Sequence, residues 1–182
     1  MTTTMTRPKV LVTYATWLGS TTEIALTIGD MLRAGGHEVE VTAIPEVKFV
    51  GPFKTVIVGG PIRVGEWSPD VVNFLEANRH LLRDRRLALF VTCLTMRMDT
   101  PESRHIVRGY IQPVLESFPD LRPFDVGLFA GAFDVHRVPG REQVKLWSKP
   151  HLQGDFRDWT AIREWAIGVS TYLASLEMPH KA

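Results

Sequence analysis

The residues with the clearest chemistry lie in a short turn near the start of the chain, in the segment TYATWLGSTTEIA at residues 13–25. An apolar run ends there, hydroxyl residues and one glycine follow, and a helical pattern begins. A loop that leads into a helix N-terminus presents free backbone N–H groups and the positive end of the helix dipole, which together bind anions. Because the turn has no lysine or arginine, we expect a phosphate monoester held by neutral donors, with the backbone N–H groups of residues 17–21 among them. The residues expected around the phosphate are Thr16, Trp17, Leu18, Gly19, Ser20 and Thr21.

Other phosphate-binding turns fit this segment less well. A P-loop ends in Gly-Lys-Ser/Thr, but here Gly19 is followed directly by Ser20. A dinucleotide turn needs three spaced glycines, and only Gly19 is present. A helix cap without any ligand is the plain alternative, because Ser20 and Glu23 have the spacing of a capping box. The turn by itself leaves both the phosphate and the simple cap open.

The elements that position this turn follow from the hydrophobic pattern. Apolar runs rich in β-branched residues predict strands, and apolar residues at helical spacing predict helices. Strands are expected at 9–15, 37–44, 54–60, 86–94 and 125–133. Helices are expected from Ser20 to Gly35, from Pro69 to about 82, and at about 102–117 and 158–176. This alternation predicts an α/β fold, a flavodoxin-like doubly wound parallel sheet of five strands with helices on both faces.

Two further strand ends bear on the turn, because a ligand of such a sheet lies outside the C-terminal ends of the strands, where strand order reverses. The third strand leads into GGPIRVGEWSPD at 59–70, and the fourth into TCLTMR at 92–97. Both segments are expected beside the first turn, with a flat aromatic ligand between them. The residues expected along the ring are Pro61, Ile62, Arg63, Val64, Gly65, Trp67, Thr92, Cys93, Leu94 and Thr95.

Composition limits the class of protein. The chain has 182 residues, of which 45% are hydrophobic and 23% charged, and its net charge is +1. These values predict one globular domain over 1–182 that binds no nucleic acid. Within it we expect a disordered tail at 1–7 and a long loop at 134–157. The single cysteine predicts a reducing compartment, and the six histidines have no metal-ligand spacing, so no metal is expected. With no leader or apolar span, a cytoplasmic protein is expected, and peripheral contact with the inner face of a membrane stays open.

The turn T-x-x-G-S-T at 16–21 resembles the FMN phosphate loop of flavodoxin-type proteins. More narrowly, the segments VIVGGPIRVGEWSPDVVNFL (56–75), LFAGAF (128–133) and GDFRDWTAIREWA (154–166) resemble the menaquinone-dependent protoporphyrinogen oxidase branch. The resemblance implies FMN as the cofactor, and hydride removal from a reduced small-molecule substrate such as protoporphyrinogen, with a quinone as acceptor. Segment 134–157 is shorter than the insertion that this branch uses for quinone and membrane contact. A non-catalytic electron-transfer flavodoxin with a redox protein partner, or a binding module without cofactor, are the alternatives.

Individual residues of the expected ring site have alternative roles. Gly65 either permits a peptide flip toward the flavin or is an ordinary turn glycine. Trp67 either covers a flavin face or packs on the helix that follows. Cys93 is expected as a small buried side chain rather than a nucleophile. No acid–base side chain stands out, so no catalytic residue is named.

Arg63 gives the first testable expectation. A cation near the pyrimidine side of the ring stabilises the reduced, anionic flavin and so raises its reduction potential. We expect Arg63→Ala to lower the potential of bound FMN, measured by an anaerobic redox titration. An unchanged potential would exclude this role and leave Arg63 as a surface residue.

Overall fold

The computed structural model describes residues 8–138, 140 and 150–177. The predicted tail at 1–7 lies outside the described residues, as do residues 139 and 141–149 of the predicted long loop. At the described ends of that loop the chain forms the short 3-10 helices η3 (Val135–Arg137) and η4 (Pro150–Leu152). No described helix combines the length and the apolar character needed to cross a membrane.

A parallel sheet forms the centre of the fold, with the strand order β2-β1-β3-β5-β6. The number and direction of these strands agree with the sequence prediction. Because β1 lies between β2 and β3, strand order reverses beside β1, which is where doubly wound sheets bind ligands. The strands are β1 (Lys9–Tyr14), β2 (Glu38–Ala43), β3 (Thr55–Arg63), β5 (Arg86–Thr92) and β6 (Pro123–Phe129).

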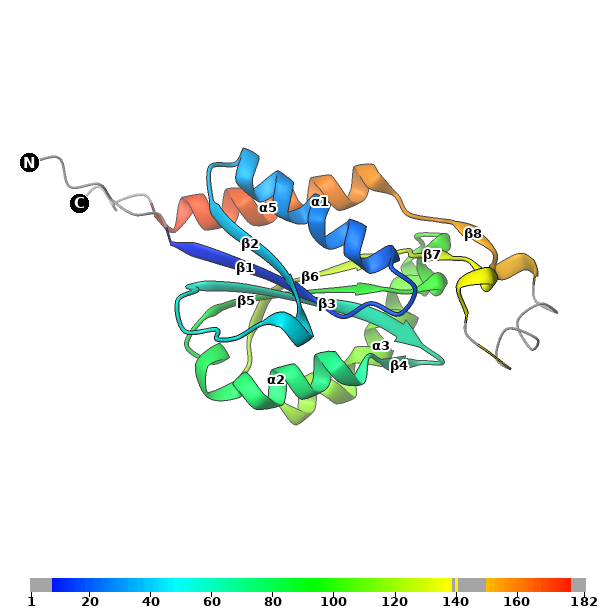
Figure 1. The fold of residues 1–182 in the computed structure, drawn as a ribbon, viewed down its shortest axis with the longest axis horizontal. Helices are drawn as coiled ribbons and strands as arrows, with labels where there is room; N and C mark the ends of the chain where they lie inside the picture. The colour runs from blue at the N-terminus through cyan, green and yellow to red at the C-terminus, as the bar shows by residue number, and fades with distance from the viewer. Residues whose placement is uncertain (1–7, 139, 141–149, 178–182) are drawn as a thin grey trace, which may run out of the picture.

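Helices cover both faces of the sheet (Figure 1), with α1 and α5 on one face and α2 and α3 on the other. Along β1 the side chains alternate between these two layers. Leu11 packs with the layer of α2 and α3, whereas Val10 and Val12 pack with the layer of α1 and α5. This two-sided burial explains the almost continuous apolar strand sequences. The helices are α1 (Ser20–Ala34), α2 (Pro69–Leu82), α3 (Pro101–Ser117), α5 (Trp159–Ser175) and the 3-10 helix η1 (Ile44–Glu46).

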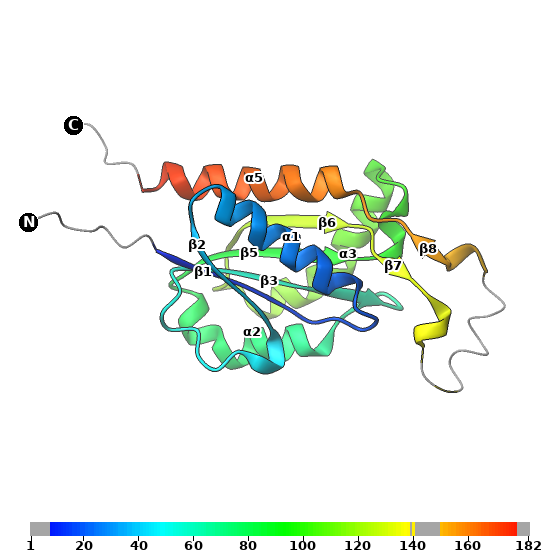
Figure 2. The same ribbon diagram turned by 45° about the horizontal axis from the view of Figure 1, so that its top comes forward.

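Three strands differ from their predicted bounds by at most two residues at either end, and two differ by more. β3 continues to Arg63 and folds back on the short antiparallel strand β4 (Glu66–Trp67). The fifth strand, predicted at 125–133, ends at Phe129. The chain leaves the sheet there, and β7 (Ala132–Phe133) pairs with β8 (Gly154–Asp155) in a separate two-stranded sheet. This small sheet lies beyond the N-terminal end of α1 (Figure 2).

The predicted capping box of Ser20 and Glu23 is wrong. Gly19 is the N-cap of α1, with a φ of 93°, and no side chain caps the helix. The positive φ explains the glycine, because other residues rarely adopt this conformation. A capping box does occur at α3, where Thr100 and Ser103 exchange side-chain and backbone hydrogen bonds.

Two glycines provide a matched test of core packing. A Cβ added to Gly59 on β3 would lie 2.0 Å from the Phe90 ring, whereas a Cβ added to Gly109 of α3 meets nothing within 4 Å. We expect Gly59→Ala to lower the free energy of unfolding by about 1–3 kcal/mol through overpacking. Gly109→Ala should raise it by roughly 0.5–1 kcal/mol, because alanine favours the helix. Urea denaturation measures both, and equal effects would contradict the packing described for Gly59.

Candidate functional site

The turn between β1 and α1 presents unpaired amides. The Gly19 N–H donates to Thr16 Oγ1 over 3.0 Å, and the Thr22 N–H donates to the Gly19 carbonyl over 3.1 Å. The N–H groups of Ser20 and Thr21 begin the helix and therefore have no acceptor within it. The Gly19 amide, which we expected to face the phosphate, is thus used inside the turn, and the two following amides carry the anion-binding potential.

A buried hydroxyl pair joins this turn to the centre of the sheet. Thr21 Oγ1 and Thr92 Oγ1 lie 3.0 Å apart, and the two residues are 1% and 3% exposed. One hydroxyl donates to the other, so the pair retains one proton for a further acceptor. Both residues line the main cavity, and the pair fixes the turn against the end of β5.

The main cavity has a volume of about 520 Å³ and lies at the C-terminal ends of β3 and β5, which contribute Arg63 and Thr92 to its lining. This volume lies within the roughly 300–1,000 Å³ of small-molecule sites. Every residue of the predicted site lines this cavity except Thr16, Gly19 and Trp67. The three loops named from the sequence therefore do meet around one space.

Trp67 packs into the core instead of covering the cavity. Its side chain is buried in the core layer that contains α2 and α3, and its Nε1 donates to the Gly60 carbonyl over 3.2 Å. The structure thus favours the second of the two roles considered for Trp67. Together with Thr16, it lines a neighbouring cavity of about 410 Å³ that shares Trp17 and Arg63 with the main one.

The β3–β4 hairpin forms the tip of one cavity wall. Arg63 pairs with Glu66, and the two residues between them, Val64 and Gly65, have φ values of 51° and 80°. Two positive φ angles are typical of a type I′ hairpin turn. A β-branched residue is strained in this conformation, and Val64 is also fully exposed. The Val64–Gly65 turn is therefore a strained segment at the cavity, as functional sites often contain.

The part of the cavity wall formed by the segment after β6 was missed by the sequence reasoning. Phe133 lies on β7, and its ring centroid is 6.3 Å from that of Trp17. The Arg63 guanidinium also lies over the Trp17 ring, 3.5 Å from its centroid. The sequence predicts residues 131–133 as part of the continuous strand 125–133, and no local pattern places them at the cavity. The lining residues that were not predicted are Tyr110, Gly131, Ala132, Phe133 and Leu152.

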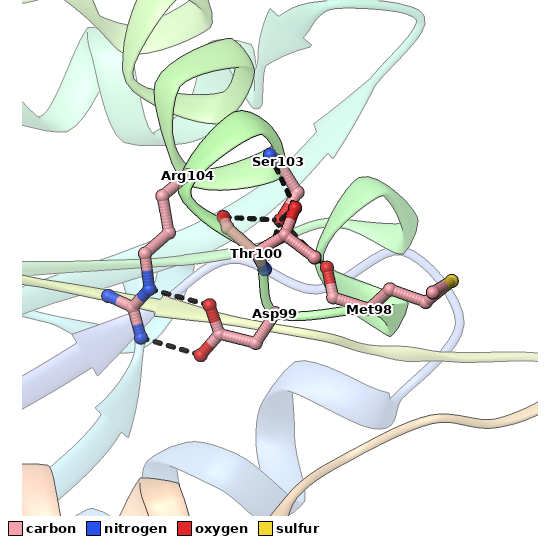
Figure 3. A network of polar contacts seen from close by, with 5 residues as sticks. All are labelled: Met98, Asp99, Thr100, Ser103 and Arg104. Atoms are coloured by element: carbon pink, nitrogen blue, oxygen red, sulfur yellow. Dashed lines mark hydrogen bonds and ion pairs between the residues drawn. The ribbon is translucent and has the colours of Figure 1, made fainter.

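A polar network fixes the third wall, which the 3-10 helix η2 (Leu94–Arg97) provides. Figure 3 shows how the chain after η2 is held at the start of α3. Arg104 donates two hydrogen bonds to the Asp99 carboxylate, over 2.5 and 2.6 Å, and Ser103 Oγ donates to the Met98 carbonyl over 2.7 Å. A bidentate pair restricts geometry more than a single contact does. The network thus positions the backbone that follows Leu94 and Thr95.

Charged residues reach the first turn from the C-terminal part of the chain. The Arg157 side chain is only 9% exposed and forms ion pairs with Glu23 and Asp155, over 2.9 and 2.6 Å. Hydrogen bonds from Arg157 hold the pKa of Asp155 below its ordinary range, and the same bonds raise the pKa of Arg157. The expectation of purely neutral surroundings is therefore incomplete, although the turn itself has no charge.

The donors and the shape of the site fit a flat ring that carries a phosphate. The Ser20 and Thr21 amides suit the phosphate, and the apolar cavity walls suit the ring. A Cβ added to Gly131 would lie 3.5 Å from Ser20 Oγ, so the glycine leaves space beside the amides. The residues present are thus compatible with a flavin mononucleotide.

Comparison with known proteins places this geometry in a family. The sequence model described as the flavodoxin domain matches residues 11–156. None of the curated proteins compared with the chain is significantly similar in sequence.

Solved structures share the fold. A flavodoxin from the domain Archaea has a TM-score of 0.56 and 13% identity, with 91% of this chain and 99% of that one covered. Flavodoxin 2 from Bacillus cereus has a TM-score of 0.55 and 18% identity, with 92% and 99% covered. Rubredoxin oxygen:oxidoreductase from Desulfovibrio gigas has a TM-score of 0.53 and 18% identity, with 95% of this chain but only 38% of that one covered. At these identities the likeness shows the fold alone.

The ion pair of Asp155 and Arg157 predicts a pH dependence of stability. Because the pKa of Asp155 is lowered on folding, its contribution is present above the ordinary aspartate value of about 3.9 and is lost as pH falls through the folded pKa. We expect Asp155→Asn to lower the free energy of unfolding by up to about 1 kcal/mol at neutral pH, since the carboxylate is half exposed. The difference should disappear in acid. Urea denaturation at several pH values measures this difference, and Glu164→Gln, at an exposed position, is the control. A difference in the free energy of unfolding that persists in acid would contradict the prediction.

Proposed function

Because the chain belongs to the flavodoxin-domain family, we propose that it binds FMN, the cofactor of that family, in the main cavity and transfers electrons to a redox protein partner. The observation that carries this proposal is the meeting of three loops at one cavity. The amides of Ser20 and Thr21 lie on one side, the β3–β4 hairpin on another, and Thr92 with the turn after it on the third.

Each wall has a distinct role in the proposal. The Ser20 and Thr21 amides bind the phosphate, with the free proton of the Thr21–Thr92 pair as a further donor. Residues 61–65 and 92–95 enclose the ring. FMN supplies the redox chemistry, and the protein supplies binding, orientation and electrostatics.

The side chains around the cavity favour electron transfer over substrate chemistry. Among the described residues that line it there is no carboxylate and no imidazole, and its proton-bearing side chains with an acid–base capacity are Cys93 and Tyr110. Enzymes that move protons to or from a substrate usually place a carboxylate or an imidazole within hydrogen-bond reach of it. An electron carrier needs none, because its partner docks at the surface and receives only electrons.

Oxidation of a reduced porphyrinogen with a quinone as acceptor is the second candidate. The apolar and aromatic lining favours it, since Trp17, Phe133 and Leu152 offer a surface to a flat apolar molecule. In this reading the protein also contacts the membrane surface from which a quinone is drawn. The two candidates share the cofactor site and differ only in what exchanges electrons with it.

One variant tests the cofactor site. Ser20→Asp places a carboxylate beside the proposed phosphate, and charge repulsion should weaken FMN binding by at least about tenfold. An acidic residue in a first helical turn is favourable, so the variant should still fold. The control is Thr160→Asp, which adds the same charge to the exposed first turn of α5. Flavin fluorescence titration measures both, and equal affinities for FMN would contradict the site.

Identification of the flavin released by heat denaturation tests the identity of the cofactor. Two assays then separate the candidate functions. Reversible reduction by a ferredoxin reductase, without turnover of protoporphyrinogen and a menaquinone analogue under anaerobic conditions, is expected for the carrier. Turnover with the quinone analogue would replace the carrier by the second candidate. A folded protein that neither contains nor takes up FMN would exclude both.

A further inference from the structure

Arginines from distant parts of the chain reach the phosphate turn, and Arg137 contacts its backbone most closely. Arg137, the last residue of η3, donates from Nη1 to the Leu18 carbonyl over 3.1 Å. The same Nη1 would lie 3.4 Å from a Cβ added to Gly19. A guanidinium is thus in contact with the backbone of a turn that contains no charged residue.

Three arginines contact the turn, but in different ways. The Arg63 guanidinium lies 3.5 Å from the Trp17 ring centroid, whereas Arg137 and Arg157 donate to backbone carbonyls of Leu18 and Ser20. Arg157 is enclosed by Glu23 and Asp155 and is almost completely buried, so its charge is compensated within the protein. Arg137 has a longer contact, 3.7 Å to Asp134, and its side chain is 62% exposed. Long, exposed ion pairs are weak, so Asp134 compensates Arg137 only in part. Of the two arginines that donate to the backbone of the turn, Arg137 has the less compensated charge.

A small hydrophobic cluster holds Arg137 in this place. Val135 and Val138, on either side of it, are buried with Phe133, and Trp17 and Leu18 pack against them. Hydrogen bonds hold the same segment: the Val135 N–H donates to Gln153 Oε1, and the His136 N–H donates to the Asp134 carboxylate. The apolar side chains of the phosphate turn therefore bind the segment that carries the arginine.

We propose that Arg137 determines which form of flavin the turn accepts, by favouring the phosphate ester over the uncharged riboflavin. The inference rests on the proposed function, because it assumes that a flavin phosphate binds at the Ser20 and Thr21 amides. Backbone amides and hydroxyls give such an anion hydrogen bonds but no net charge. A nearby guanidinium adds an attraction that depends on the ligand's charge and is screened by salt.

The test compares two ligands and three variants of the full chain. Arg137→Gln should weaken FMN binding about tenfold at low salt, within the range for a lost charge-assisted contact, and leave riboflavin binding unchanged. Arg137→Lys should restore most of the preference for FMN, because it keeps the charge. Arg163→Gln, at an exposed position of α5, is the control and should change neither affinity. Quenching of flavin fluorescence gives the dissociation constants at low salt and at high salt.

Each other outcome overturns the inference in a recognisable way. Equal weakening of FMN and riboflavin by Arg137→Gln would mean that Arg137 only pins the Leu18 carbonyl and shapes the turn. Unchanged FMN affinity, or a wild-type preference for FMN that does not fall with salt, would mean that its charge does not act on the phosphate. A wild-type chain that binds neither flavin would remove the proposed function first, and this inference with it.

Discussion

The first amides of α1 have no acceptor inside the helix, and the site is built around that deficit. Polar backbone groups that face a crevice need a partner from solvent, side chain or ligand. Gly19 turns the chain so that its own amide is bonded by Thr16, while the amides of Ser20 and Thr21 stay available. The arrangement favours an anion before any charged side chain is considered.

The topology of the sheet determines where these unpaired amides lie. Because all strands of the main path run parallel, the loops after β1, β3 and β5 emerge at the same edge. Thr92, at the end of β5, bonds the hydroxyl of Thr21, so the first and third loops are fixed to each other in the interior. The second loop is instead an extension of β3 into a hairpin, and its strained Val64 stands free at the tip. Two loops that are joined to each other and one strained hairpin thus border the cavity.

The segment after β6 explains why the phosphate turn contains large apolar residues. Trp17 and Leu18 are apolar residues in a polar loop, and they pack against Phe133, Val135 and Val138. This contact closes one side of the cavity and places Arg137 against the backbone of the loop. Burial of a large apolar side chain stabilises a fold by about 1.5–3 kcal/mol. The small hydrophobic cluster of Phe133, Val135 and Val138 therefore anchors the segment more firmly than its hydrogen bonds alone would.

The sequence by itself determined the order of strands and helices, the parallel sheet and the meeting of three loops, because periodicity and the rules of doubly wound sheets act locally or through chain order. Only the tertiary structure decided that Gly19 rather than Ser20 ends the turn, that Trp67 is buried, that Phe133 lines the cavity, and that Arg137 contacts the turn. Arg137 and Leu18 are 119 positions apart, so no local pattern relates them. Such contacts depend on how the small hydrophobic cluster packs. That packing follows from the shapes of side chains that the fold brings together, and residue spacing does not reveal it.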